Sequence, residues 1–108
     1  MTVLTLRSCK RYAVRQAATV KRPGGDELGG LLIELSQEGG RVSGLGPVDL
    51  STGDAVVLEL GEVALSAVVR WASPGVIGLR FAEALHTHEL SEMLTVSRSP
   101  QGALRYGT

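Results

Sequence analysis

The segment KRYAVRQ, residues 10–16, contains two arginines, Arg11 and Arg15, spaced four residues apart with no acidic residue nearby. At this spacing the two side chains project to the same side in a strand or in a helix. Each guanidinium offers a planar fork of N–H donors that fits a phosphate or the O6/N7 edge of guanine. The pair therefore indicates an anion site, although a solvated basic strand end is the alternative, because such pairs also arise by chance in an arginine-rich chain.

A second group of polar residues lies in ELSQEGGRV, residues 34–42. We expect Glu34 and Ser36 to share the outward face of a strand, with Gly39 in the turn that follows, where backbone N–H groups can approach a ligand. A carboxylate can accept the N1 and N2 hydrogens of guanine, and a serine hydroxyl can adapt to phosphate or base. An ordinary turn with a polar strand exit would have the same residues.

Two more residues are candidates for the same ligand. Lys10 precedes the first arginine and is a predicted phosphate contact. Trp71 can stack on a purine, but strict alternation along its strand places it on the core side with Ala67 and Val69, so both positions stay open. Arg41 and Arg70 are predicted to be solvated strand residues.

The charge distribution restricts the kind of partner. Formal net charge is zero, yet six basic residues precede the first acidic residue, Asp26, and the remaining chain holds five basic and eleven acidic residues. A basic N-terminal segment on an otherwise acidic domain suggests a local anionic ligand and not a nucleic-acid polymer, which would require a strongly basic domain.

Other chemistries have little support in the sequence. The single cysteine, Cys9, excludes an internal disulfide. His86 and His88 are two residues apart, which separates them on a helix, and we expect no metal site. No nucleophile is paired with a base and no Walker-type loop is present, so we expect no enzymatic activity and no cofactor. No apolar run approaches the roughly 20 residues of a membrane span, and we expect a cytoplasmic location without membrane insertion.

Short alternating runs separated by glycine-rich turns predict the elements that position these residues. Six strands are expected, over residues 16–22, 31–36, 40–45, 55–60, 63–71 and 76–81, with a loop over 23–30. The strongest hairpin signal is the turn at Gly61-Glu62. Residues predicted to face the core are Leu31, Ile33, Leu35, Val56, Leu58, Leu60, Val63, Leu65, Ala67, Val69, Ile77, Leu79 and Phe81. Such strands favour a mainly β fold, a small six-stranded antiparallel barrel, because closure removes exposed edges.

The periodicity becomes helical after Phe81. Leu90, Met93 and Leu94 recur at i, i+3 and i+4, with Thr87 as a predicted N-cap and Glu89 in the first turn. One C-terminal helix of about ten residues should pack on the barrel. We expect a single domain over residues 1–108, with its core at about 8–96 and a flexible tail at 97–108.

The order of these motifs resembles the PilZ domain family of bacterial cyclic di-GMP receptors. Arg11 and Arg15 match the family's RxxxR motif, and Ser36 and Gly39 match its (D/N)xSxxG motif. The run VVRWASPGVIGLRF, residues 68–81, also looks like the family's late hairpin. The resemblance covers about residues 8–95 and implies a barrel on which the two arginines hold cyclic di-GMP against the face bearing Glu34 and Ser36.

The resemblance also implies a ligand-dependent switch acting on an unidentified bacterial protein in motility, biofilm or polysaccharide machinery. On this hypothesis the basic N-terminal arm orders when the ligand binds. Glu34 stands where the family has Asp or Asn, and its extra methylene moves the acceptor outward. The alternative is therefore a PilZ-like protein-interaction module that does not bind the nucleotide.

Overall fold

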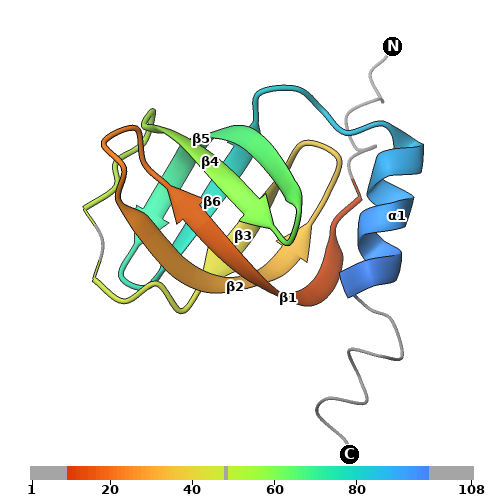
Figure 1. The fold of residues 1–108 in the computed structure, drawn as a ribbon, viewed down its shortest axis with the longest axis horizontal. Helices are drawn as coiled ribbons and strands as arrows, with labels where there is room; N and C mark the ends of the chain where they lie inside the picture. Colours follow the sequence, from red (N-terminus) through yellow and green to blue (C-terminus); the bar gives the residue numbers. More distant parts are fainter. Residues whose placement is uncertain (1–9, 48, 98–108) are drawn as a thin grey trace, which may run out of the picture.

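The chain folds into a closed antiparallel barrel with one helix beside it (Figure 1). This computed structural model describes residues 10–47 and 49–97. The elements are β1 (Tyr12–Lys21), β2 (Glu27–Leu35), β3 (Gly39–Ser43), β4 (Ala55–Leu60), β5 (Val63–Ser73), β6 (Val76–Phe81) and α1 (Thr87–Ser97). Their order around the barrel is β1-β2-β3-β6-β5-β4, and the pairing of β4 with β1 closes it. The predicted fold class is confirmed.

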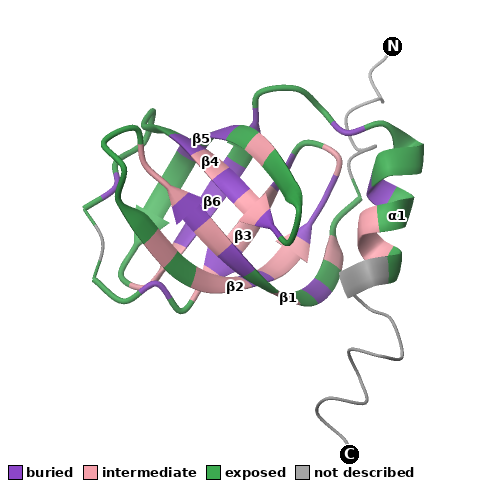
Figure 2. Ribbon diagram, viewed as in Figure 1, coloured by how far each residue is buried: buried purple, intermediate pink, exposed green. Residues whose placement is uncertain are grey.

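Buried residues alternate with more exposed ones along the strands (Figure 2), and the buried side chains form one core inside the barrel. The largest fully buried side chains come from all six strands and are Val20, Leu32, Leu35, Val42, Leu58, Val69 and Ile77. Eight of the predicted core residues that lie on β4, β5 and β6 are buried, namely Val56, Leu58, Leu60, Ala67, Val69, Ile77, Leu79 and Phe81, and Leu65 is partly buried. The prediction was wrong for Val63, which is 41% exposed because it follows directly on the Gly61-Glu62 turn.

Two strands begin earlier than the sequence predicts. β1 starts at Tyr12 instead of Gln16, so Arg15 lies within a strand and not in a loop before it. β2 starts at Glu27, within the stretch predicted as a loop. Gly30, which the sequence predicts in that loop, lies in β2 and permits close strand packing: a Cβ there would lie 2.6 Å from the Ser43 carbonyl oxygen.

Bulges change which side chains face the core. The register of β2 against β3 shifts between Leu32 and Glu34, so Leu32 and Leu35 are both buried while Leu31 and Ile33 are only partly buried. The predicted core face of this strand was therefore wrong at Leu31 and Ile33. An inserted residue breaks the period of two, and no strict alternation can describe such a strand.

The helix α1 stands at one end of the barrel, beside the start of β1 (Figure 1). Leu90 is buried, and Met93 and Leu94 pack partly buried against the core, as predicted. The cap is one residue earlier than expected: the His86 carbonyl accepts the Leu90 N–H, and the His86 N–H donates to the Glu89 carboxylate at 2.8 Å. The predicted tail, from residue 98 onward, lies outside the described residues.

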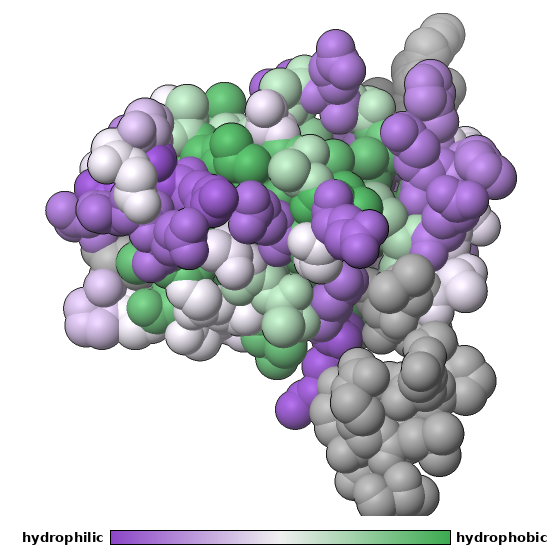
Figure 3. Space-filling view, in the orientation of Figure 1, coloured by the Kyte–Doolittle hydropathy of each residue, from purple (hydrophilic) through white to green (hydrophobic). Residues whose placement is uncertain are grey.

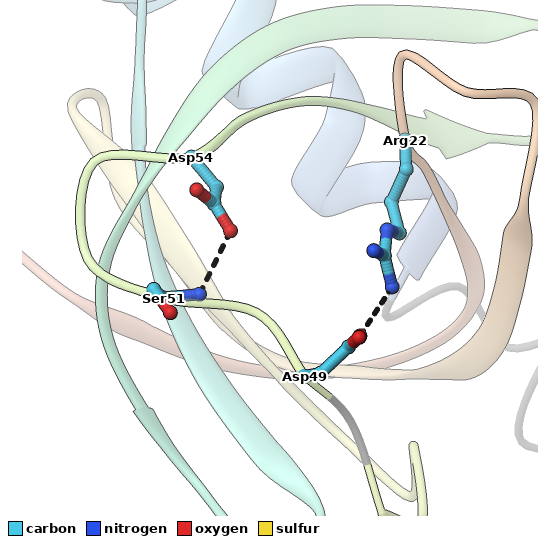
Figure 4. A network of polar contacts seen from close by, with 4 residues as sticks. All are labelled: Arg22, Asp49, Ser51 and Asp54. Atoms are coloured by element: carbon cyan, nitrogen blue, oxygen red, sulfur yellow. Dashed lines mark hydrogen bonds and ion pairs between the residues drawn. The ribbon is translucent and has the colours of Figure 1, made fainter.

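An ion pair fastens the long connection between β3 and β4. The Arg22 guanidinium, just after β1, contacts the Asp49 carboxylate, and Asp54 accepts the Ser51 N–H at 2.8 Å within the same connection (Figure 4). The ion pair holds the connection against the β1–β2 hairpin, and the hydrogen bond closes a turn within the connection.

Candidate functional site

A hollow of about 270 Å³ opens where β2, β3, β5 and β6 meet. It is lined by Arg11, Glu34, Ser36, Glu38, Gly39, Gly40, Arg41, Arg70, Trp71, Gly78 and Leu79. Five of the seven residues that the sequence singled out are among them: Arg11, Glu34, Ser36, Gly39 and Trp71. The other two, Lys10 and Arg15, do not line it.

Ser36 holds the turn between β2 and β3. Its side-chain oxygen accepts hydrogen bonds from the backbone N–H groups of Glu38 and Gly39, both at 3.2 Å. The backbone N–H of Ser36 donates to the Gly39 carbonyl at 2.9 Å. The residue is only 8% exposed. The expectation of an outward-facing hydroxyl was therefore wrong, because β2 ends at Leu35 and the Ser36 hydroxyl is used within the turn.

Gly39 is required by close packing against β6. A Cβ at this position would lie 2.0 Å from the Leu79 carbonyl oxygen, which no side chain can tolerate. Because its N–H already bonds Ser36, Gly39 shapes the floor of the hollow and does not offer a free donor, in contrast to the expectation from the sequence.

Glu34 and Arg41 are directly opposite each other on β2 and β3. The Glu34 carboxylate lies 3.3 Å from one terminal guanidinium nitrogen of Arg41, and both side chains are partly exposed. The Arg41 Nε is buried and has no hydrogen-bond partner in the described part of the chain. A buried donor without a partner is costly, so this group would gain from a ligand acceptor.

Trp71 lies at the wall of the hollow and not in the core. Its indole rests against Gly78, where a Cβ would come within 2.3 Å of the ring, and the Arg41 guanidinium lies 5.6 Å from the ring centroid. The register of β5 against β6 shifts between Val69 and Trp71, so Arg70 is an extra residue in a bulge. This bulge turns Trp71 away from the core side that alternation predicted and leaves it 39% exposed.

The basic segment contributes one arginine to the hollow. Arg11 lies directly before β1 and lines the hollow. Arg15 lies in β1, where the register against β2 shifts between Ala13 and Gln16. The Lys10 ammonium lies 5.7 Å from the centroid of the Tyr12 ring. The four-residue spacing alone therefore does not bring both arginines to the same point.

Arg41 and Arg70, predicted to be solvated strand residues, both line the hollow. A signal for Arg41 was present, because a hairpin that turns between Ser36 and Gly39 must place residue 41 opposite Glu34, its opposite charge. For Arg70 no such signal exists, since the bulge that exposes it depends on pairing with β6.

Other kinds of site find no support among residues 10–47 and 49–97. No group of three or more histidine, cysteine, aspartate or glutamate side chains there could hold a metal ion. No helix in the same part of the chain is long and apolar enough to cross a membrane. Cys9, the one cysteine, lies outside the described residues.

Comparisons with known proteins agree with this fold. The family model described as PilZ domain matches residues 5–96. A similar solved structure is the Bacillus subtilis inhibitor of motility, MotI/DgrA, at 16% sequence identity and a TM-score of 0.63. The alignment covers 88% of this chain and 50% of that one, so this chain spans about half the length of its neighbour. No curated protein sequence matches this chain.

Proposed function

Because the chain belongs to the PilZ domain family, a family of cyclic di-GMP-binding type, we propose that its hollow binds cyclic di-GMP. PilZ domains are receptor and effector modules and not enzymes, so binding would act by changing what the domain contacts. The proposed function is that of a ligand-dependent switch on a partner protein. The similar solved protein is an inhibitor of motility, and motility machinery is accordingly one proposed class of partner, beside biofilm and polysaccharide machinery.

The observation that carries this proposal is the gathering of three arginines, Arg11, Arg41 and Arg70, around one hollow. Arg41 also has a buried Nε without a hydrogen-bond partner in the described part of the chain. Arg11 and Arg70 also line the hollow, and neither has a carboxylate within 4.0 Å among the described residues. A ligand with two phosphates and two guanine edges supplies acceptors for such donors.

Trp71 supports binding of a purine. Its partly exposed indole lies close against Gly78, with the Arg41 guanidinium 5.6 Å from the ring centroid, and a base can stack on the exposed part of the ring. Stacking on an aromatic side chain contributes about 1–3 kcal/mol per base in nucleotide sites. Trp71 is therefore proposed to contact one guanine.

The hollow is too small to enclose the whole dinucleotide. Its volume of about 270 Å³ lies below the range of about 300–1,000 Å³ that is usual for ligand pockets. We expect it to hold one guanine and the adjoining phosphate. Lys10 and Arg11, which lie directly before β1, would then close over the rest of the ligand, and Arg15 would contact it from its fixed place on β1.

Calorimetric titration with cyclic di-GMP at about 0.15 M salt tests the proposal, with GTP as the competing nucleotide. We expect saturable binding in the wild type, loss of binding in Arg11→Ala, and unchanged binding in Lys21→Ala. Lys21 is a suitable control because it pairs with Glu27 and Glu59 on β2 and β4 and does not line the hollow. Absence of heat and of any amide shift in the wild type would refute the receptor function.

One observation favours a second candidate function, a protein-interaction module without nucleotide binding. The Glu34 carboxylate, proposed to accept a guanine edge, is already paired with Arg41. If that pair persists in the presence of cyclic di-GMP, the guanine acceptor is missing. On this second function the wild type gives no heat with cyclic di-GMP, whereas Glu34→Asp, whose carboxylate is drawn back from Arg41, binds it.

A further inference from the structure

A second hollow, of about 490 Å³, lies beside the first one. It is lined by Thr52, Gly53, Val68, Val69, Arg70, Arg80, Phe81 and Ala82. The connection before β4 forms one side of it and is held to β5 by three hydrogen bonds. The Gly53 N–H donates to the Val69 carbonyl at 2.8 Å, the Val69 N–H donates to the Asp54 carbonyl at 2.9 Å, and the Thr52 hydroxyl donates to the Arg70 carbonyl at 3.1 Å. This side of the hollow is therefore fixed by hydrogen bonds to the backbone of β5.

Val68 and Ala82 contribute small apolar side chains to the lining of this hollow. Val68 is 38% exposed and pairs with Ala55 on β4 and with Arg80 on β6. Figure 3 shows hydrophobic surface gathered over the β4–β5 hairpin. An aliphatic side chain of a partner can pack on Val68 without displacing a large residue.

Two arginines flank this apolar surface without a partner of opposite charge. Among the described residues, neither Arg70 nor Arg80 has a carboxylate within ion-pair distance, whereas Lys21, Arg22 and Arg41 each have one. Arg70 projects from its bulge, and Arg80 is exposed on β6. Two exposed guanidinium groups beside an apolar surface are complementary to carboxylates that flank an aliphatic side chain.

We propose that the second hollow binds an acidic, aliphatic peptide segment of a partner protein. Its carboxylates pair with Arg70 and Arg80, and its aliphatic side chain packs on Val68. A nucleic-acid strand fits the surface less well, because the one aromatic residue that lines the hollow, Phe81, is buried and offers no ring on which a base can stack.

Arg70 lines both hollows, which couples the two sites. This part of the inference rests on the proposed cyclic di-GMP binding. A phosphate that engages Arg70 removes one of the two cations from the second hollow, so the ligand weakens segment binding, and by linkage the segment weakens ligand binding equally. The segment is thus released when cyclic di-GMP binds.

The test uses a pool of acetylated decapeptides made of Asp, Glu, Leu and Val in random order, with a second pool in which Asn and Gln replace the acids. Amide chemical shifts of the whole chain are followed during titration. We expect the acidic pool to shift the amides of Gly53, Val68, Arg80 and Ala82, and the uncharged pool to leave them unchanged. Arg80→Gln should weaken the response about two- to fivefold, the range of a single exposed ion pair, and Lys21→Gln should not.

Several outcomes would overturn the inference. These are no shifts at millimolar peptide, equal shifts with both pools, an unchanged response in Arg80→Gln, or shifts of these amides by a single-stranded RNA oligonucleotide but not by the peptides. The coupling is tested separately by adding cyclic di-GMP to the acidic pool. If the dinucleotide binds but leaves the peptide response intact, the coupling is refuted, whereas if it does not bind at all, the proposed function fails while the peptide site stands.

Discussion

Glu34 shows how one methylene can change the state of a site. Its carboxylate reaches across to Arg41, directly opposite on β3, and pairs with it at 3.3 Å. Because both side chains are partly exposed, the pair contributes at most about 1 kcal/mol. Such a weak pair cannot prevent a ligand from binding, but it opposes any ligand that needs the same carboxylate.

Shortening this side chain should therefore strengthen the proposed binding. In Glu34→Asp the carboxylate is drawn back from Arg41, and we expect cyclic di-GMP to bind about two- to fivefold more tightly, in proportion to the energy of the pair. Calorimetric titration of both proteins measures the ratio. A variant at Glu62, in the β4–β5 turn, serves as the control: Glu62→Asp should bind as the wild type does. Weaker binding in Glu34→Asp would show that the longer side chain is the better acceptor.

Ser36 and Gly39 match the second motif, but their roles in the structure are largely internal. The serine hydroxyl accepts two N–H groups of its own turn, and the glycine allows β3 to approach β6. Substituting either residue would damage the turn that positions Glu34 and Arg41. Loss of ligand binding in such variants would consequently not identify a ligand contact.

At the scale of elements, the bulge in β5 decides the character of the hollow. It exposes Arg70 and turns Trp71 from the core side onto Gly78. One insertion in the strand thus supplies the hollow with both a cation and an aromatic wall. Gly78 completes the arrangement because any side chain there would displace the indole.

Gly78→Ala should therefore detach Trp71 from β6. The new Cβ would come within 2.3 Å of the ring, so we expect the indole to move into solvent, with a red shift of the emission of the one tryptophan in the chain and weaker binding of cyclic di-GMP. Gly24→Ala is the matched control, since nothing lies within 4 Å of a Cβ at that position. An unchanged emission maximum in Gly78→Ala would contradict the packing described here.

The connection between β3 and β4 depends on Asp49 in a pH-dependent way. The hydrogen bond from Arg22, and then its charge, lower the pKa of Asp49 below its ordinary value. A carboxyl group with a lowered pKa in the folded protein stabilises it above the unfolded pKa, about 3.9, and this contribution is lost as pH falls through the lowered folded value.

Asp49→Asn should accordingly be less stable than the wild type at neutral pH, and the difference should vanish in acid. Thermal unfolding followed from pH 7 down to about pH 2 measures both curves. Because the pair is exposed, the difference will be small, and Glu62→Gln provides the baseline for removing an exposed acid. A difference between Asp49→Asn and wild type that stays constant over this range would exclude the ion pair as its cause.

At the scale of the whole molecule, the first hollow exists only in the closed barrel. Its lining residues lie directly before β1, in β2 and the turn that follows β2, and in β3, β5 and β6. The residue before β1, the β2–β3 hairpin and the β5–β6 hairpin are far apart in the chain. The unfolded chain has no such arrangement. A ligand of this hollow must therefore bind the folded state alone and stabilise it by mass action.

Saturating cyclic di-GMP should raise the melting temperature. At a free concentration of 100 times Kd the stabilisation is about 2.7 kcal/mol, which corresponds to an increase of at least about 10 °C for a domain of this size. Differential scanning calorimetry measures the shift, and Arg11→Ala should show none. The same rise with GTP would indicate an effect of nucleotide charge without specificity.

Local patterns in the sequence determined the number of strands, the Gly61-Glu62 turn, the helix and most of the site's composition. Alternation, turn residues and helical spacing are properties of neighbouring residues, so they can be recognised without a structure. Tertiary structure decided where β1 and β2 begin, which of Arg11 and Arg15 lines the hollow, and that Arg70 and Trp71 face outward. These features depend on bulges and on register between strands distant in the chain, and only the closure of the barrel sets them.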